Sequence, residues 1–174
     1  GGLISKNLNQ FAQYRFLSSK NIFNNKNYFK VIFWEEVADH LNFLRKKFPN
    51  FKIGLHNHGL EFHSIEEMRT PWDILHEKLD SEIFYQLDIG NAALSNQDPL
   101  KIFNQYKNRI KSIHYKIPFS PRKKLLDKSN CKKILDQFSN LNDSPQIICE
   151  LTSKNNKIFN ELDKLIEELR SINF

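Results

Sequence analysis

Cysteine, methionine and glycine are scarce in this chain: its 174 residues contain two cysteines, one methionine and five glycines. Cys131 and Cys149 stand alone, which disfavours a disulfide-stabilised scaffold and suits a reducing compartment, so we expect a cytoplasmic protein. Cys149 lies within an apolar segment, and we expect it to be a small core residue and not a nucleophile.

A long apolar run and a secretory signal are also missing. A membrane helix needs about 20 apolar residues in succession, and no stretch of the sequence approaches that length. We therefore expect one soluble α/β domain with no membrane partner. Because the chain opens with Gly1-Gly2 and its methionine is Met68, we expect the native start codon to lie elsewhere.

The formal net charge is +6, from 26 basic and 20 acidic side chains. A basic excess raises the expectation of a polyanionic partner. Lysine and asparagine are spread along the whole chain, however, and the densest basic run, at residues 121–124, falls in a predicted loop. Nucleic acid is therefore not the partner that we expect.

Four short apolar segments each end on a residue that can bind a metal or transfer a proton. The end positions lie 26 to 36 residues apart, which is a suitable length for one strand–helix repeat. The segments and their end residues are Ile53–Leu55 before His56, Ile83–Leu87 before Asp88, Ile110–Ile113 before His114, and Ile147–Cys149 before Glu150.

Amphipathic helices are predicted between these strands. Apolar residues at three- and four-residue spacing predict a helix over Trp34–Phe48. Thr70-Pro71 and Asp98-Pro99 each combine an N-cap with a proline at the first helical position, and they predict helices to about Leu79 and Tyr106. Further helices are expected over residues 131–138 and 158–169, whereas residues 1–33 show no clear periodicity.

Strands that alternate with helices and carry chemistry at their C-terminal ends are typical of a TIM-type (β/α) barrel. A complete barrel needs about 200 residues, so we expect a partial α/β barrel with four parallel strands. Residues 1–33 are assigned to an irregular N-terminal segment, and residues 34–174 to the C-terminal half of the barrel. Half a barrel exposes sheet edges, which favours pairing with another chain as a homo-oligomer.

Side chains at four successive strand ends would converge on one face, as a divalent metal site requires. The set His56, Asp88, His114 and Glu150 offers imidazole nitrogens and carboxylate oxygens. Such a mixed set suits Mn, Co, Fe or Zn better than Ca and is unlike a thiolate site. We expect a divalent metal ion as the cofactor, with Mg as a further candidate. Each residue taken alone also fits a role as an ordinary cap or loop residue.

Several motifs resemble the xylose isomerase-like TIM-barrel superfamily, and more narrowly its sugar phosphate isomerase/epimerase group. The likeness covers about residues 34–170. The residues that carry it are the HNHxxEF segment within Ile53–Phe62, the DxG of Leu87–Asn91, the HxK of Ile113–Lys116, and Ile148–Glu150.

The resemblance implies a metal-dependent enzyme that acts on a sugar or sugar phosphate and moves a proton next to a carbonyl through a metal-stabilised enediolate. It assigns Asp88, His114 and Glu150 to the metal. His56 is our fourth ligand, and Glu61 competes for that place.

Proton transfer is expected from groups beside the metal. Glu61 and Glu150 are the candidate bases, while His58 would donate to a hydroxyl. Lys116 would neutralise developing negative charge, although an exposed strand-end lysine is an equally simple interpretation.

Departures from the pattern keep alternatives open. A pair of glutamates serves the epimerases of this superfamily, and His56 in place of one of them makes lyase or dehydratase chemistry on an oxidised sugar plausible. A catalytically inactive or truncated relative that acts as a binding or scaffold protein is one alternative. A phosphodiesterase related to endonuclease IV, which would use the positive charge on phosphate, is the other.

Overall fold

The fold is known from a computed structural model, which describes residues 11–13, 26–115, 128–141 and 146–149, together with 162–163, 166–167 and 169–170. The chain divides into two compact units, Gly1–Tyr85 and Gln86–Phe174. In the described part, no helix is both long enough and apolar enough to cross a bilayer.

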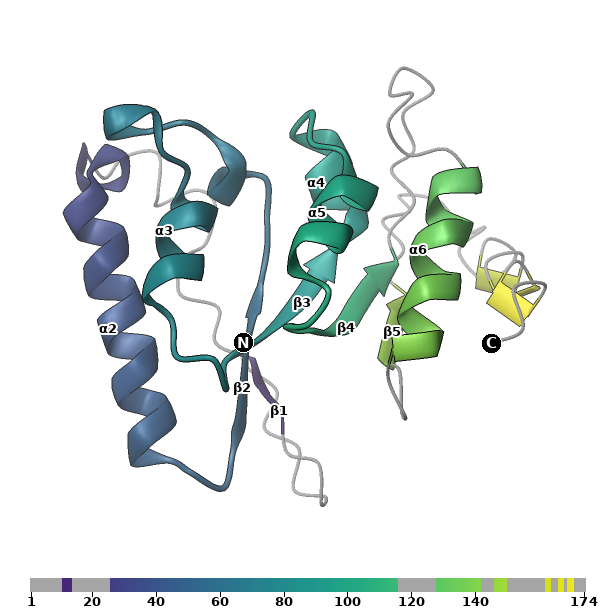
Figure 1. The fold of residues 1–174 in the computed structure, drawn as a ribbon, viewed down its shortest axis with the longest axis horizontal. Helices are drawn as coiled ribbons and strands as arrows, with labels where there is room; N and C mark the ends of the chain where they lie inside the picture. The colour runs from purple at the N-terminus through teal and green to yellow at the C-terminus, as the bar shows by residue number, and fades with distance from the viewer. Residues whose placement is uncertain are drawn as a thin grey trace. The chain divides into compact units, whose positions relative to one another are not determined.

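Each unit contains a pair of parallel strands (Figure 1). In the first unit, β1 (Phe11–Gln13) pairs in parallel with β2 (Lys52–His56), with Ala12 opposite Ile53. In the second unit, β4 (Ile110–Tyr115) pairs in parallel with β5 (Gln146–Cys149). The order of hydrogen-bonded neighbours is β1-β2-β3-β4-β5. Strand β3 (Phe84–Asp88) starts in the first unit and ends in the second.

Two helices pack side by side in the first unit, α2 (Val31–Lys47) and α3 (Pro71–Lys78) (Figure 1). The Asn42 side chain joins them, because its amide donates to the Lys78 carbonyl at 2.9 Å and accepts from the Asp80 N–H at 2.7 Å. It thereby satisfies a carbonyl at the end of α3 that has no partner within the helix.

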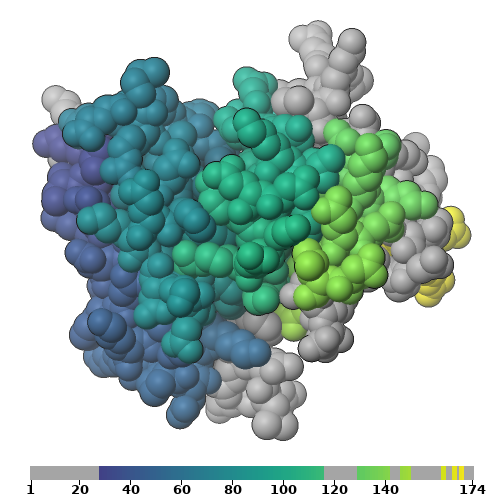
Figure 2. Space-filling model, viewed as in Figure 1, coloured from purple at the N-terminus to yellow at the C-terminus, as the bar shows by residue number. Residues whose placement is uncertain are grey.

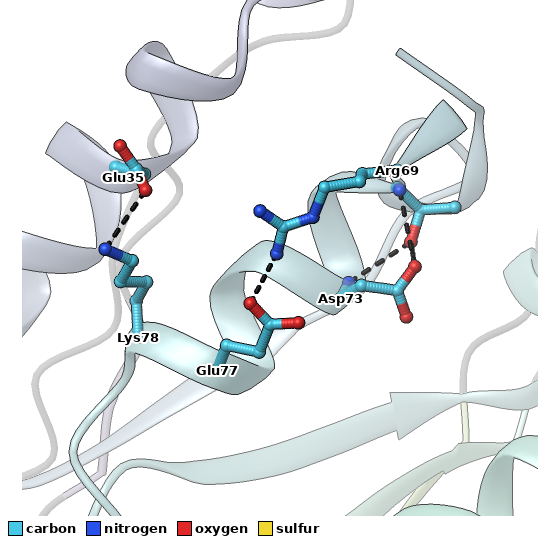
Figure 3. A network of polar contacts seen from close by, with 6 residues as sticks. Glu35, Arg69, Asp73, Glu77 and Lys78 are labelled. Carbon is cyan, nitrogen blue, oxygen red and sulfur yellow. Dashed lines mark hydrogen bonds and ion pairs between the residues drawn. The ribbon is translucent and has the colours of Figure 1, made fainter. Parts of the chain in front are cut away.

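The start of α3 is fixed by a capping box (Figure 3). The Thr70 hydroxyl accepts from the Asp73 N–H at 3.1 Å, while the Asp73 carboxylate accepts from Thr70. An ion pair joins Arg69 to Glu77, and Lys78 reaches Glu35 of α2 at 3.0 Å. The predicted start of this helix is confirmed, since the cap is encoded within four consecutive residues.

Aromatic side chains fill the space between α3 and the strands of the first unit. The rings of Phe62 and Trp72 lie 5.2 Å apart, and those of Trp72 and Tyr85 4.8 Å apart. All three side chains are buried. Phe62 and Trp72 therefore serve the core, which is the commoner use of such residues.

The second unit has three described helices, α4 (Ile89–Leu94), α5 (Pro99–Tyr106) and α6 (Lys128–Leu141). Helix α5 begins as predicted, since Asp98 accepts the N–H of Leu100 at 2.9 Å. Helices α5 and α6 pack through Phe103 and Phe138, whose rings meet edge to face at 6.5 Å.

Several boundaries differ from the prediction. Helix α2 begins at Val31, whose N–H donates to Glu66 at 3.2 Å. Strand β1 lies within residues 1–33, where we predicted no strand, and the short helix α4 was not predicted either. The predicted C-terminal helix is described only at residues 162–163, 166–167 and 169–170, which are helical.

Gly54 gives a direct test of packing in the first unit. A Cβ at this position would lie 2.3 Å from Cζ of Phe84, far inside van der Waals contact, so we expect Gly54→Ala to lower the free energy of unfolding by about 1–3 kcal/mol. The same substitution in a Phe84→Leu background should cost markedly less, because the ring is gone. Urea titrations measure both differences, and equal costs in the two backgrounds would contradict the assigned contact.

Candidate functional site

Asp88 and His114 come together in the second unit. Asp88 is the last residue of β3 and is fully buried, while His114 lies near the end of β4. Oδ2 of Asp88 lies 3.8 Å from Nδ1 of His114, whose side chain is 12% exposed. Two of the predicted metal ligands are therefore neighbours in a largely buried place.

The backbone fixes the direction of the Asp88 carboxylate. Asp88 is also the N-cap of α4, and its Oδ1 accepts the N–H of Asn91 at 2.7 Å. The positive end of the helix favours the negative charge. One oxygen is thus held by the helix start, while the other faces His114.

The HNHxxEF segment lies in the first unit. His56 ends β2, and its ring meets the ring of His58 edge to face at 5.0 Å between centroids. Asn57, between them, is fully buried. The segment thus turns immediately after the strand and leaves the two imidazoles side by side.

Glu61 is bound to its own segment. Its Oε2 accepts the backbone N–H of His58 at 2.8 Å, and its Oε1 lies 3.6 Å from Nδ1 of His58. The side chain is largely buried in the short 3-10 helix η2 (Leu60–Phe62). A carboxylate so placed fixes the position of His58 relative to the end of β2.

Tyr28, which the sequence did not suggest, supports the same segment. Its hydroxyl donates to the Leu60 carbonyl at 2.5 Å, and its own carbonyl accepts from Nε1 of Trp34 at 2.9 Å. Burial raises the pKa of Tyr28 well above its usual value, and the nearby charge of Glu61 raises it further. No local pattern marks this residue, because its partner lies 32 positions along the chain.

The remaining predicted residues fall outside the described part of the chain. They are Lys116, which directly follows β4, and Glu150, which directly follows β5. Cys149, just before Glu150, is half-buried, and burial raises the pKa of its thiol. A thiol of raised pKa is a poor nucleophile at neutral pH, as expected. The half-buried side chain is not the core residue that we expected.

Comparison with known proteins finds similar sequences and similar folds. No protein-family model matches the chain. Inosose dehydratase from Lacticaseibacillus casei is 35% identical over 106 residues, which is 58% of this chain and 34% of that protein. Inosose dehydratase from Clostridium tetani is 36% identical over 99 residues, 55% of this chain and 32% of that one.

Solved structures show the same likeness. A sugar phosphate isomerase/epimerase from Parabacteroides distasonis aligns with a TM-score of 0.64 and 19% identity over 77% of this chain and 52% of its own. A second sugar phosphate isomerase/epimerase from that organism aligns with a TM-score of 0.59 and 17% identity. The alignment covers 72% of this chain and 48% of the other. The predicted kinship with the xylose isomerase-like TIM-barrel superfamily is confirmed.

The predicted fold class, a partial TIM-type barrel with parallel strands alternating with helices, is confirmed with it. The aligned stretch spans about a third of each dehydratase and about half of each structural neighbour. In barrels of this type, functional residues gather at the C-terminal ends of the strands. Asp88 ends β3 and His114 lies near the end of β4, so both stand at such strand ends in this chain.

Tyr28 predicts how stability depends on alkaline pH. A raised pKa in the folded state stabilises the protein below the ordinary value of 10.0, and this contribution is lost as the pH rises above it. Tyr28→Phe should cost about 1 kcal/mol at neutral pH through the lost hydrogen bond. The difference between parent and variant should shrink above about pH 10. Urea titrations followed by tryptophan fluorescence measure it, and a difference that stays constant with pH would refute the assignment.

Proposed function

We propose that the chain carries the metal-binding part of a sugar-processing enzyme, with His56, Asp88, His114 and Glu150 holding one divalent ion. The observation that carries this proposal is the buried pair of Asp88 and His114 at 3.8 Å. The dehydratase relatives and the isomerase/epimerase neighbours support it.

The donor set fits such an ion. His56, Asp88 and His114 offer two imidazole nitrogens and one carboxylate oxygen, a set that could hold a metal ion. Imidazole and carboxylate together suit Mn, Co, Fe or Zn. His56 ends β2, the strand end at which the family resemblance places a further ligand, and this supports its inclusion.

A bound divalent ion would draw electron density from a substrate carbonyl oxygen and so ease removal of the adjacent proton. The chain must supply the group that takes this proton. Glu61 is already held by the His58 backbone and is largely buried, so we assign it the positioning of His58. Glu150 is then our candidate base, with Lys116 beside developing negative charge.

The names of the relatives point to dehydration of an inosose. In such a reaction a proton leaves the carbon next to the carbonyl and passes to a carboxylate. The hydroxyl on the next carbon then departs as water with a proton from an imidazole, and a carbon–carbon double bond forms. His58 is our candidate for that imidazole. Isomerisation and epimerisation share the first of these steps.

Exchange of the substrate proton with solvent tests this shared step. We expect the chain with Mn²⁺ to replace the hydrogen next to the carbonyl of an inosose or a ketose by deuterium in D₂O, as measured by proton NMR. Asp88→Asn keeps an N-cap oxygen for α4 but removes the charge. It should slow exchange by about 100-fold or more, since loss of a group that merely supports a ligand costs 10–100-fold.

Asp98→Asn is the matched control, because Asp98 caps α5 in the same way. It should leave the exchange rate within about twofold of the parent, as a remote cap change affects stability alone. Exchange that is absent in the folded parent, or equally fast in Asp88→Asn, would overturn the proposed function.

A further inference from the structure

The outward face of α2 exposes large apolar side chains. Ile32 is 55% exposed and Phe43 is 54% exposed. Eleven residues make three helical turns, so both lie on one side, about 16 Å apart along the axis. The opposite side is buried through Trp34, Val37 and Leu41. In the space-filling view, the purple and blue atoms of α2 occupy the surface of the first unit (Figure 2).

Opposite charges are separated along the same face. The exposed acidic residues Glu36 and Asp39 precede the exposed basic residues Lys46 and Lys47. Glu36 and Asp39 stand beyond the first turn, where interaction with the helix dipole has faded. Glu35 and Arg45, by contrast, are already paired with Lys78 and Glu82.

We propose that this face binds a second copy of the chain, with the two α2 helices antiparallel about a twofold axis. An antiparallel pair brings the acidic half of each helix against the basic half of the other. The register that places Glu36 opposite Lys47 of the partner subunit also places His40 opposite Phe43 of the partner subunit. A parallel pair would bring like charges together.

The charge pattern favours a second copy over other occupants. A face with both signs in balance is self-complementary, which is what a twofold interface requires. An anionic lipid surface or an acidic peptide would be repelled by Glu36 and Asp39. Nζ of Lys47 lies 5.5 Å from the centroid of the Phe43 ring, so the basic end of this face borders its exposed aromatic side chain. The inference does not depend on the proposed function.

Sedimentation velocity on the full chain tests the proposal. One helix pair lies at the low end of stable interface areas, so we expect association that depends on concentration. The mass should rise from 20.7 kDa towards twice that value between roughly 1 and 100 μM. Phe43→Asp should abolish the dimer, with folding checked by circular dichroism.

Exchanging the charges of Glu36 and Lys47 tests whether these two residues meet across the interface. Lys47→Glu and Glu36→Lys should each weaken dimerisation about tenfold, because the twofold axis repeats each ion pair. The double variant should regain the parent affinity within about threefold. Lys132→Glu on α6 makes the same charge change elsewhere on an exposed position and should have no such effect.

Three results would overturn the proposal. The first is a folded parent that stays monomeric over the whole concentration range. The second is a dimer that neither Phe43→Asp nor the charge variants weaken. The third is a folded double variant that does not recover affinity, which would mean that Glu36 and Lys47 do not meet across the interface.

Discussion

The carboxylate of Asp88 is the group on which the candidate site depends. A buried charge is costly unless other groups compensate for it. Here the start of α4 supplies an N–H at 2.7 Å, and the His114 imidazole stands 3.8 Å from the other oxygen. Asp88 therefore has two roles: it caps α4 directly after β3, and it faces the His114 imidazole of β4. One side chain thus serves the fold as a helix cap and the candidate site as a charged group.

A similar arrangement fixes the histidines of the first unit. Glu61 accepts the His58 backbone N–H, and Tyr28 holds the carbonyl of Leu60 next to it. Glu61 thus stabilises the HNHxxEF segment through a hydrogen bond within it, and Tyr28 connects the segment to an earlier part of the chain. Because Tyr28 is buried beside a carboxylate, it stays protonated in the folded protein. The spacing of the motif has a physical reason in these bonds.

Local signals explain what the sequence predicted well. Thr70-Pro71 and Asp98-Pro99 encode helix starts within a few residues, and both helices begin there. The apolar runs before Asp88 and His114 predicted buried strands, because both faces of a strand in a parallel sheet are covered. The neighbourhood of Asp88 and His114 followed from their place at the ends of adjacent strands.

Contacts between distant residues explain what the sequence missed. Helix α2 starts at Val31 because Glu66 accepts the Val31 N–H. No sequence pattern near Val31 predicts this contact with a residue so far along the chain. Strand β1 is three residues long and exists through its pairing with β2. Helix α4 follows Asp88 without a break. The sequence therefore indicated Asp88 as a metal ligand and did not reveal that it also caps a helix. The roles of Lys116 and Glu150 remain predictions.

Elemental analysis of the purified protein tests whether Asp88 and His114 bind a metal. We expect about one equivalent of a divalent transition metal in the parent, and its loss in folded Asp88→Ala and His114→Ala. Asp98→Ala, which removes a cap of the same kind from α5, should retain the metal. A folded parent without metal after incubation with Mn²⁺, Co²⁺ or Zn²⁺, or equal metal in all variants, would show that these residues do not form a metal site.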